Sequence, residues 1–431
     1  MKNKTSTNCT FRVNDFEATK YKVLNWAKQF NTFCFLDNHQ YQIAPHSVEC
    51  LLAAGEKRMI STIAGSALKE LEQFIMERKS WLFGHLSYDL KNEIEALCSG
   101  RIDKVGFPDL FFFEPEVIIR LSGGEMNIEA DDATAIFDQV EKTVNTPLPA
   151  SDNIVEIKKR ISKEQYVDYV QKLQKHIARG DCYEVNFCQE FFAEKVIIDP
   201  LFVYKKLSGA SPNPFSALYR VHDKWLICAS PERFLKRNGS TVISQPIKGT
   251  SRRVTDDMNE DELNKQTLYN STKDRSENVM VVDLVRNDLA KVCREGTVHV
   301  DELFGIYSFP QVHQMISTVS GELKPQASFE EIIRATFPMG SMTGAPKKRV
   351  MELIEQYEQT RRGIFSGAVG YITPNGDFDF NVVIRSIMYN DSSKYLSFQA
   401  GSGITFYSQA EQEWEECLLK AEAIKKVLEN N

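Results

Sequence analysis

A lysine between a proline and a glycine is the first candidate for chemistry in this sequence. The stretch SQPIKGTSRR, residues 244–253, places Lys248 in what the pattern predicts to be a turn that closes a strand. A turn uses the glycine and the proline, but it has no need of a lysine. A neutral lysine amine can act as a nucleophile. On this stretch alone, a solvated loop lysine and a reactive lysine both remain open.

A carboxylate is expected close to this lysine. An Asn-Gly dipeptide at 238–239 lies between two strand-like runs, which is the strongest short hairpin pattern. A two-residue turn there pairs Arg237 with Ser240. Counting back along both strands places Glu232 opposite Gln245, which is three residues before Lys248. At about 3.3 Å per residue, Glu232 and Lys248 should lie within roughly 10 Å of each other. The alternative is a surface ion pair that contributes little to stability.

Two expected helices each carry a pair of acids three residues apart, which places both acids of a pair on one helix face. The helices cover 271–292 and 409–430, and the pairs are Asp274 with Glu277 and Glu413 with Glu416. Mg²⁺ prefers oxygen ligands and commonly takes one or two carboxylates together with waters and an anionic substrate. The acids could therefore hold a divalent cation, although surface helices are rich in acids and the pairs could equally be solvated.

Several further features suit an anionic ligand. A glycine-rich loop at 338–346 leads into an amphipathic helix, with Pro346 in its first turn. Strict alternation over 377–389 predicts one continuous strand, on which Arg385 could bind a carboxylate. Gly401 and Gly403 would let backbone N–H groups approach a ligand. His313, by contrast, is more often structural when it is considered alone.

The elements that must position these groups belong to a large folded protein. The chain has 431 residues, a hydrophobic content of 42% and 27 phenylalanines, which together predict two or three domains or one large intertwined one. A proline-containing stretch at 144–153 is the best linker candidate, and it divides the chain into regions 1–150 and 151–431. Ser162 followed by Gln165 predicts the start of a helix that ends near Gly180.

Composition excludes some classes of protein. A net charge of −7 argues against a nucleic-acid or membrane-surface binder, since no broad basic field is available. The nine cysteines are scattered and odd in number, with no CxxC pair, which predicts reduced thiols. The start of the chain lacks the apolar core of a signal peptide, and no apolar run is long enough to span a membrane. We therefore expect a cytoplasmic protein.

Taken together, these stretches resemble the chorismate-utilising enzymes, most densely from residue 162 to residue 427. The strings that carry the resemblance are GDCYEVNFCQEF (180–191), SPERFL (230–235), PIKGTSRR (246–253), KDRSENVMVVDLVRNDLAKV (273–292), FPQVHQMIS (309–317), PMGSMTGAPKKRVMELIE (338–355), VVIRSI (382–387) and AGSGITFYSQAEQEWEECLLKA (400–421). The resemblance implies an α+β, two-lobed fold of mainly antiparallel sheets packed face to face with helices outside. It makes 1–150 a region like the N-terminal part of anthranilate synthase component I, and 151–431 the chorismate-binding catalytic domain.

The resemblance also assigns roles to the site residues. Lys248 would attack C2 of chorismate, which requires a lowered pKa, and Glu232 would protonate the leaving C4 hydroxyl, which requires a raised one. His313 would lie near the same hydroxyl. Mg²⁺ would be held by Glu277 and Glu416, with Asp274 and Glu413 nearby, and would bind the ring carboxylate. The remaining substrate contacts would come from Thr343, Phe365, Arg385, Gly401 and Gly403.

Two positions distinguish members of the family. Those that activate water carry a lysine at the position of Glu184, whereas members that form anthranilate usually carry a small residue at the position of Lys248. A lysine at 248 implies addition of ammonia at C4, with the ammonia supplied by a separate glutamine amidotransferase. Anthranilate formation and a non-catalytic, amidotransferase-binding subunit are the alternatives.

Overall fold

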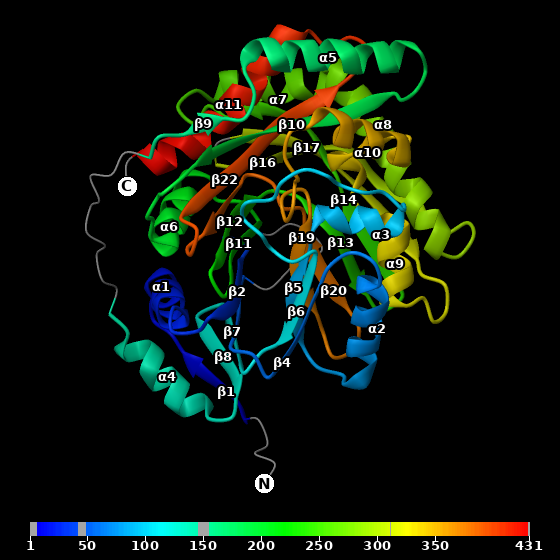
Figure 1. Ribbon diagram of the computed structural model, residues 1–431. Coiled ribbons are helices and arrows are strands. Elements are labelled where there is room, and N and C mark those ends of the chain that lie inside the picture. Colours follow the sequence, from blue (N-terminus) through cyan, green and yellow to red (C-terminus); the bar gives the residue numbers. More distant parts are fainter. Residues whose placement is uncertain (1–6, 42–48, 145–154, 311, 430–431) are drawn as a thin grey trace.

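Two large antiparallel sheets organise the chain in the computed structural model, which describes residues 7–41, 49–144, 155–310 and 312–429 (Figure 1). The first sheet runs β1 (Thr7–Arg12), β8 (Glu125–Ala130), β7 (Val117–Ser122), β3 (Cys50–Ala54), β2 (Thr32–Asp37), β11 (Phe215–Val221), β12 (Lys224–Ser230), β21 (Ser386–Asn390), β22 (Tyr395–Ile404), β10 (Glu184–Ala193) and β18 (Gly344–Ala345), with β9 (Lys158–Lys159) also beside β10.

The second sheet runs β15 (Ile247–Arg252), β17 (Val312–Glu322), β14 (Thr241–Gln245), β13 (Arg233–Asn238), β20 (Phe378–Asn381), β19 (Ala368–Ile372), β5 (Leu82–Leu86), β6 (Leu110–Glu114) and β4 (Arg58–Thr62), with β16 (His299–Ser308) also beside β17. The expected α+β fold with large antiparallel sheets is therefore confirmed.

Helices lie on the outside of the sheets (Figure 1). They are α1 (Phe16–Ala27), α2 (Ala67–Glu77), α3 (Lys91–Ile94), α4 (Ala133–Lys142), α5 (Lys163–Ala178), α6 (Pro200–Ala210), α7 (Met258–Asn270), α8 (Thr272–Val292), α9 (Phe329–Thr336), α10 (Lys347–Tyr357) and α11 (Ala410–Glu429), with 3₁₀ turns at Tyr88–Leu90 and Gly340–Met342. Helix α11 packs on β22 and α5, whereas α8 packs on β15 and β17. No helix in the described ranges combines the length and the apolar character that crossing a bilayer requires.

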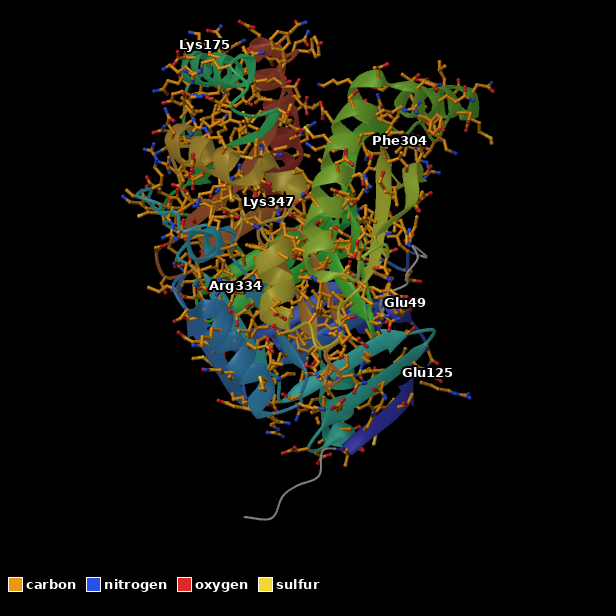
Figure 2. The ribbon with its side chains drawn as sticks, turned by 90° about the vertical axis from the view of Figure 1, so that its right-hand side faces the viewer. Glu49, Glu125, Lys175, Phe304, Arg334 and Lys347 are labelled. Carbon is orange, nitrogen blue, oxygen red and sulfur yellow. The ribbon has the colours of Figure 1, made fainter. Side chains whose placement is uncertain are left out.

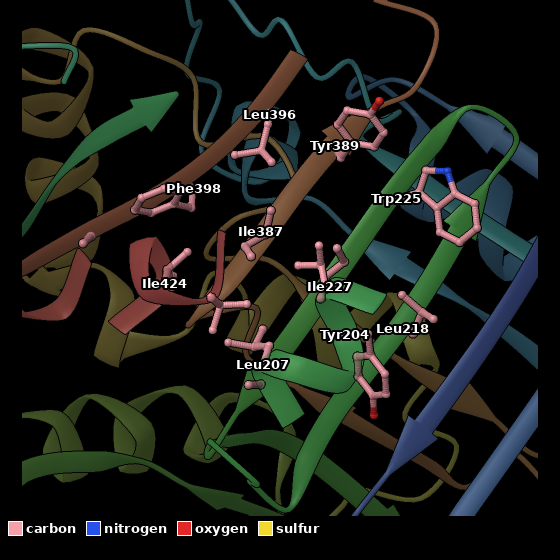
Figure 3. Close-up of a cluster of buried hydrophobic side chains, with 14 of the residues drawn as sticks. Tyr204, Leu207, Leu218, Trp225, Ile227, Ile387, Tyr389, Leu396, Phe398 and Ile424 are labelled. Atoms are coloured by element: carbon pink, nitrogen blue, oxygen red, sulfur yellow. The ribbon is translucent and has the colours of Figure 1, made fainter. Parts of the chain in front are cut away.

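The first sheet separates two hydrophobic cores, as alternate residues of β12 show. Trp225 and Ile227 face a core shared with α5, α6 and α11, part of which is drawn in Figure 3. Leu226 and Cys228 face the other core, which contains side chains of the second sheet such as Phe380. The period of two along the strand thus sends alternate side chains to opposite faces. Full burial of a large apolar side chain stabilises the fold by about 1.5–3 kcal/mol. The buried side chains on both faces of this sheet therefore contribute to the stability of the fold.

Both sheets combine strands from either side of residue 150. β2 pairs with β11 in the first sheet, and β5 pairs with β19 in the second. The division into 1–150 and 151–431 stays a prediction, and the linker expected at 144–153 lies almost wholly outside the described residues. The strand pairing means that residues before the linker complete the sheets that carry the later residues.

The helices expected from capping and periodicity are confirmed. Helix α5 begins with a capping box between Ser162 and Gln165. Helix α8 begins after Ser271, whose side chain accepts from the N–H of Asp274, and α11 covers the other acidic pair. Pro346 directly precedes α10.

Two strand predictions are wrong in detail. The hairpin pairs Arg237 with Val242 instead of Ser240, because Gly239, with φ of 61°, and the next residue form the turn. A bulge between Arg233 and Lys236 then shifts the pairing by one residue.

The single strand expected over 377–389 is in fact two, β20 and β21, which belong to different sheets. The chain crosses between the sheets at 382–385, where Arg385 has φ of 51°. A residue with this backbone conformation cannot continue a strand.

Candidate active site

Lys248 lies in a β-bulge. The pairing of β15 with β17 is interrupted between Ile247 and Thr250, and Gly249 there has φ of 91°. Such an extra residue bends the strand and turns its side chain away from the regular alternation. The prediction of a simple turn is therefore wrong: the glycine forms a bulge within a strand, and the bulge presents the lysine.

The bulge brings Lys248 against Glu184 at the start of β10. The Lys248 Nζ lies 2.7 Å from the Glu184 Oε1, and the two side chains are 11% and 3% exposed. Gly403 of β22 borders both groups: a Cβ there would lie 2.2 Å from Glu184 Oε1 and 3.1 Å from Lys248 Nζ. The absence of a side chain at Gly403 is therefore what leaves room for this ion pair.

The lysine is held as an ammonium in this state of the protein. Burial lowers the pKa of the Lys248 amine, but the negative charge of Glu184 and of two further carboxylates outweighs burial and keeps that pKa above its ordinary value. The two others are Glu277 and Glu232. The expected lowered pKa is thus wrong here, because three acids surround one amine.

Glu232 has the raised pKa that a general acid needs. It is buried between β12 and β13, and burial raises its pKa to about 7 despite the opposing effects of Ser341 and Lys248. Ser341 donates a hydrogen bond of 2.6 Å to its Oε1. The influence of Lys248 on this pKa agrees with the expected proximity of the two groups. The next residue, Arg233, is also buried and donates two hydrogen bonds to Asp379.

Of the expected substrate-binding residues, Gly403 borders the Lys248–Glu184 pair and Arg385 interacts with Glu232. Arg385 is partly buried and close enough to Glu232 for the two charges to interact, and burial lowers its pKa. Thr343 is buried, and its carbonyl accepts a hydrogen bond from the N–H of Asn186, two residues after Glu184. The carbonyl of Gly401 accepts from Lys420.

The backbone at Gly401 itself is tight, since a Cβ there would lie 2.0 Å from the carbonyl oxygen of Phe187. Phe365 is buried, with its N–H bonded to the carbonyl of Arg362.

His313 is engaged elsewhere. Its Nδ1 lies 2.8 Å from Ser308 Oγ and its Nε2 lies 3.0 Å from Asp261 Oδ1, so each ring nitrogen has a partner outside the Lys248 ion pair. It pairs with Ser251 in the ladder of β15 and β17. These contacts fix the strand that carries Lys248, and a catalytic role for His313 stays a prediction.

The four acids of α8 and α11 surround a lysine that the sequence did not single out. Burial lowers the pKa of Lys273, but carboxylates raise it above its ordinary value. In order of effect they are Glu277, Glu413, Glu416 and Asp274. The closest contact is 4.0 Å, between Lys273 Nζ and Glu277 Oε1. The charges of all four predicted metal ligands thus act on this one lysine.

The donor set suits a hard cation. Burial raises the pKa of Glu277 to about 7, and its Oε1 is buried without a hydrogen-bond partner. Within the described ranges, His, Cys, Asp and Glu side chains form no group of three or more already close enough to hold a metal ion. Two of the acids have other partners, since Glu413 accepts a short hydrogen bond from Ser402 and Glu416 pairs with Lys420 at 2.7 Å. The carboxylates fit Mg²⁺ in chemistry and charge.

Helix α8 is fixed at several points along its length. Asn278 is buried, and its Oδ1 accepts a 2.6 Å hydrogen bond from Ser317 of β17. Further along the helix, Asp288 is 2.5 Å from the Nζ of Lys347. Lys347, which is labelled in Figure 2, is the first residue of α10. These contacts attach α8, the helix that carries Glu277, to β17 and α10.

Comparison with known proteins decides the family. The sequence model of the chorismate binding enzymes matches residues 21–426. The chain belongs to the chorismate binding enzymes. Aminodeoxychorismate synthase component 1 of Klebsiella aerogenes is 34% identical over 351 residues, which cover 80% of this chain and 77% of that protein. Anthranilate synthase component 1 of Mycolicibacterium smegmatis is 33% identical over 378 residues, covering 80% and 71%.

A solved structure supports the same assignment. Anthranilate synthase component I from Streptococcus pneumoniae TIGR4 superimposes with a TM-score of 0.77 at 25% identity, over 90% of this chain and 94% of that one. The sequence relatives above are named for two different reactions, so family membership alone does not give the reaction of this chain. The specific reaction must be argued from the site.

Three site residues of this chorismate binding enzyme escaped sequence reasoning. Glu184 had no assigned role, because its contact with Lys248 depends on how distant strands are placed. Ser341 lies in the predicted glycine-rich loop, but nothing in the pattern indicated a bond to Glu232. Lys273 precedes Glu277 by four residues, and that spacing is the signal that could have identified it.

Proposed function

We propose that this chain is component I of an aminodeoxychorismate synthase. It would convert chorismate and ammonia to 4-amino-4-deoxychorismate, the precursor of 4-aminobenzoate in folate biosynthesis. The observation that carries this proposal is the buried Lys248 amine, presented by a bulge beside Glu184 and within electrostatic reach of Glu232. The relative from Klebsiella, named for this reaction, supports it.

In the proposed reaction the two groups have complementary tasks. The Lys248 amine attacks C2 of the ring while Glu232 gives its proton to the leaving oxygen at C4. The raised pKa of about 7 at Glu232 supports this, because its acid form is then present near neutral pH. Ammonia subsequently enters at C4, the two ring double bonds move back, and Lys248 is released.

The acids of α8 and α11 would hold Mg²⁺, with Glu277 and Glu416 as direct ligands and Asp274 and Glu413 close by. Bound there, the ion would neutralise the ring carboxylate of chorismate. The buried Oε1 of Glu277, which accepts no hydrogen bond from the described residues, supports the assignment. Lys273 and Lys248 would then balance the remaining negative charge.

The other end of the substrate would be bound by the chain itself. Arg385, with the backbone around Gly401 and Gly403, would take the enolpyruvyl carboxylate. Burial lowers the pKa of Arg385, yet the group stays cationic and can form charge-assisted hydrogen bonds. Thr343 and Phe365 would line the pocket.

Ammonia would come from a separate glutamine amidotransferase. The relative from Klebsiella is named a component 1, which supports a two-component enzyme.

Product identity tests the proposal. Incubation with chorismate, ammonium and Mg²⁺ should give a non-aromatic amine, identified by mass and absorbance. Anthranilate synthase component I is the second candidate, favoured by the similarity to the S. pneumoniae structure, and it would give a fluorescent aromatic product instead. A non-catalytic subunit would leave chorismate unconsumed.

A further inference from the structure

We propose that Glu184 takes the proton from the Lys248 ammonium before the lysine attacks the substrate, and returns it when the lysine leaves. This inference rests on the proposed function, in which Lys248 is the nucleophile. It assigns a task to a carboxylate at a position where water-activating members of the family carry a lysine.

The geometry provides a direct proton path. Glu184 Oε1 is 2.7 Å from Lys248 Nζ, which is hydrogen-bond distance. The other oxygen, Oε2, is buried without a hydrogen-bond partner in the described structure. The carboxyl group is therefore not committed to a second donor, and it can accept the lysine proton without breaking another contact.

The other groups that face Lys248 are less well placed. Glu277 of α8 and Glu232 before β13 both affect its charge, and Lys248 in turn affects Glu416 of α11. Among the described carboxylates, Glu184 is the one in ion-pair contact with the lysine. Glu232 cannot accept the lysine proton, because it must itself be protonated to donate a proton to the C4 oxygen.

Burial favours the neutral form of the pair and so lowers the cost of the transfer. As an ammonium and a carboxylate, the pair carries two charges in a site where side-chain exposure is 11% and 3%. Transfer of one proton within the pair leaves a neutral amine and a neutral acid, and so removes both desolvation penalties. Gly403, which has no side chain to separate the two groups, keeps them in contact.

The steps balance in protons and electrons. Proton transfer gives a neutral Lys248 amine and a protonated Glu184. The amine lone pair forms the Nζ–C2 bond, the C1–C2 double bond moves to C1–C6, and the C5–C6 double bond moves to C4–C5. The C4–O bond breaks as Glu232 protonates the oxygen to release water. Ammonia then attacks C4, the two double bonds return to C5–C6 and C1–C2, and the Nζ–C2 bond breaks to release a neutral lysine amine. Glu232 takes one proton from the new ammonium at C4, and the proton on Glu184 goes back to the lysine.

Formation of the covalent adduct tests this directly. Chorismate is mixed with the full chain and Mg²⁺ without ammonium, and the adduct is followed by intact-protein mass spectrometry from pH 7 to pH 9. Glu184→Gln should form it about 100-fold more slowly at pH 7, as expected for loss of a general base. The deficit relative to wild type should shrink as pH rises, because solvent then deprotonates the lysine. Glu232 titrates in both proteins, so its effect cancels when the rate of adduct formation in the variant is divided by the wild-type rate.

Two further variants keep the test decisive. Glu190→Gln is a matched control on the same strand, since Glu190 is equally buried but bonds to Arg160, Tyr395 and Ser397; it should form the adduct at the wild-type rate. Glu184→Asp keeps a carboxylate and should keep the wild-type pH profile at a reduced rate. If Glu184→Gln does not fold, a pH profile of Glu184→Asp that departs from wild type overturns the proposal.

The outcomes separate this inference from the proposed function. A wild-type adduct rate in Glu184→Gln, or a deficit that does not change with pH, overturns the role of Glu184 alone. Absence of the adduct in the wild-type protein overturns the nucleophile assignment and the inference with it.

Discussion

Lys248 and Gly403 belong to different sheets, and a Cβ on Gly403 would lie 3.1 Å from the Lys248 Nζ. The site therefore forms where the second sheet, through the bulge in β15, meets the end of β22 in the first. Its geometry depends on the relative position of the two sheets, which the buried core between them fixes.

Gly403→Ala should separate Lys248 from Glu184. The new Cβ would be 2.2 Å from Glu184 Oε1, so that side chain must move. We expect the fold to be retained and the activity to fall at least about tenfold. This loss is smaller than the full contribution of general base catalysis, which is about 10²–10⁴-fold. Gly209→Ala is the control, since a Cβ there meets no atom within 4 Å. Steady-state rates and far-UV circular dichroism check both; an unchanged rate in Gly403→Ala would contradict the expectation.

Lys248→Ala should abolish the covalent adduct and product formation. Without the amine, attack at C2 has no nucleophile, and we expect a rate loss on the order of 100-fold or more. The matched control is Lys172→Ala, because Lys172 is a surface lysine paired with Asp168 on α5. Intact mass after chorismate addition and product assay are the measurements. Aminodeoxychorismate formed by Lys248→Ala at the normal rate would show that the nucleophile is another group.

Activity should fall as pH rises through about 7. The pKa of Glu232 is raised by burial to about 7, so the proton that it donates is present below that pH and is lost above it. The pH profile of kcat/KM should therefore have a descending limb near 7. Glu232→Gln should lose this limb together with about 10²–10⁴-fold in rate. A wild-type rate that increases steadily from pH 7 to pH 9 is incompatible with this role.

Removal of Mg²⁺ should stop turnover reversibly. Exhaustive chelation should abolish chorismate consumption, and added Mg²⁺ should restore it. Mg²⁺ should also raise the melting temperature of the wild-type protein, because it binds the folded state, but not that of Glu277→Gln. Glu415→Gln is the control, since Glu415 lies on the exposed face of α11 and pairs with Lys163. Turnover that survives chelation would remove the metal from the proposal.

Arg233→Met should destabilise the fold. Arg233 is 1% exposed and donates to both carboxylate oxygens of Asp379 and to Gln245. Removal of Arg233 leaves the buried Asp379 with only the more distant Lys236, at 3.6 Å, as an ion-pair partner among the described residues. Loss of one partner of a buried pair costs about 3–5 kcal/mol. Urea unfolding measures the loss. Arg237→Met, further along the same strand and more exposed, should change stability by less than about 0.5 kcal/mol; equal effects in the two variants would contradict the buried ion pair as the cause.

Local patterns in the sequence predicted the helices of the site well. Caps and apolar stripes identify α5, α8, α10 and α11, because these signals are contained in a few consecutive residues. The acids on α8 and α11 could be proposed as one site only through the family resemblance, since spacing alone does not show that the two helices meet.

The strands were harder to predict. Both β20 and β21 are buried, so the pattern over 377–389 gives no sign that the chain changes sheets at Arg385. At Lys248, the sequence Pro-Ile-Lys-Gly is equally consistent with a turn and with a bulge, and only the pairing of β15 with β17 distinguishes them. The contact of Glu184 with Lys248 joins residues 64 positions apart, beyond the reach of any local pattern.

The sharing of strands between the two parts of the chain limits how it can be shortened. A chain that began after residue 154 would lack β2 and β5, and would leave β11 and β19 as bare edges with unpaired N–H and C=O groups. Exposed strand edges invite pairing with other copies and lead to aggregation. The residues that carry the chemistry lie in the later part, but that part expressed alone should be an aggregating protein, whereas co-expression with the first 144 residues as a separate chain could supply the missing strands.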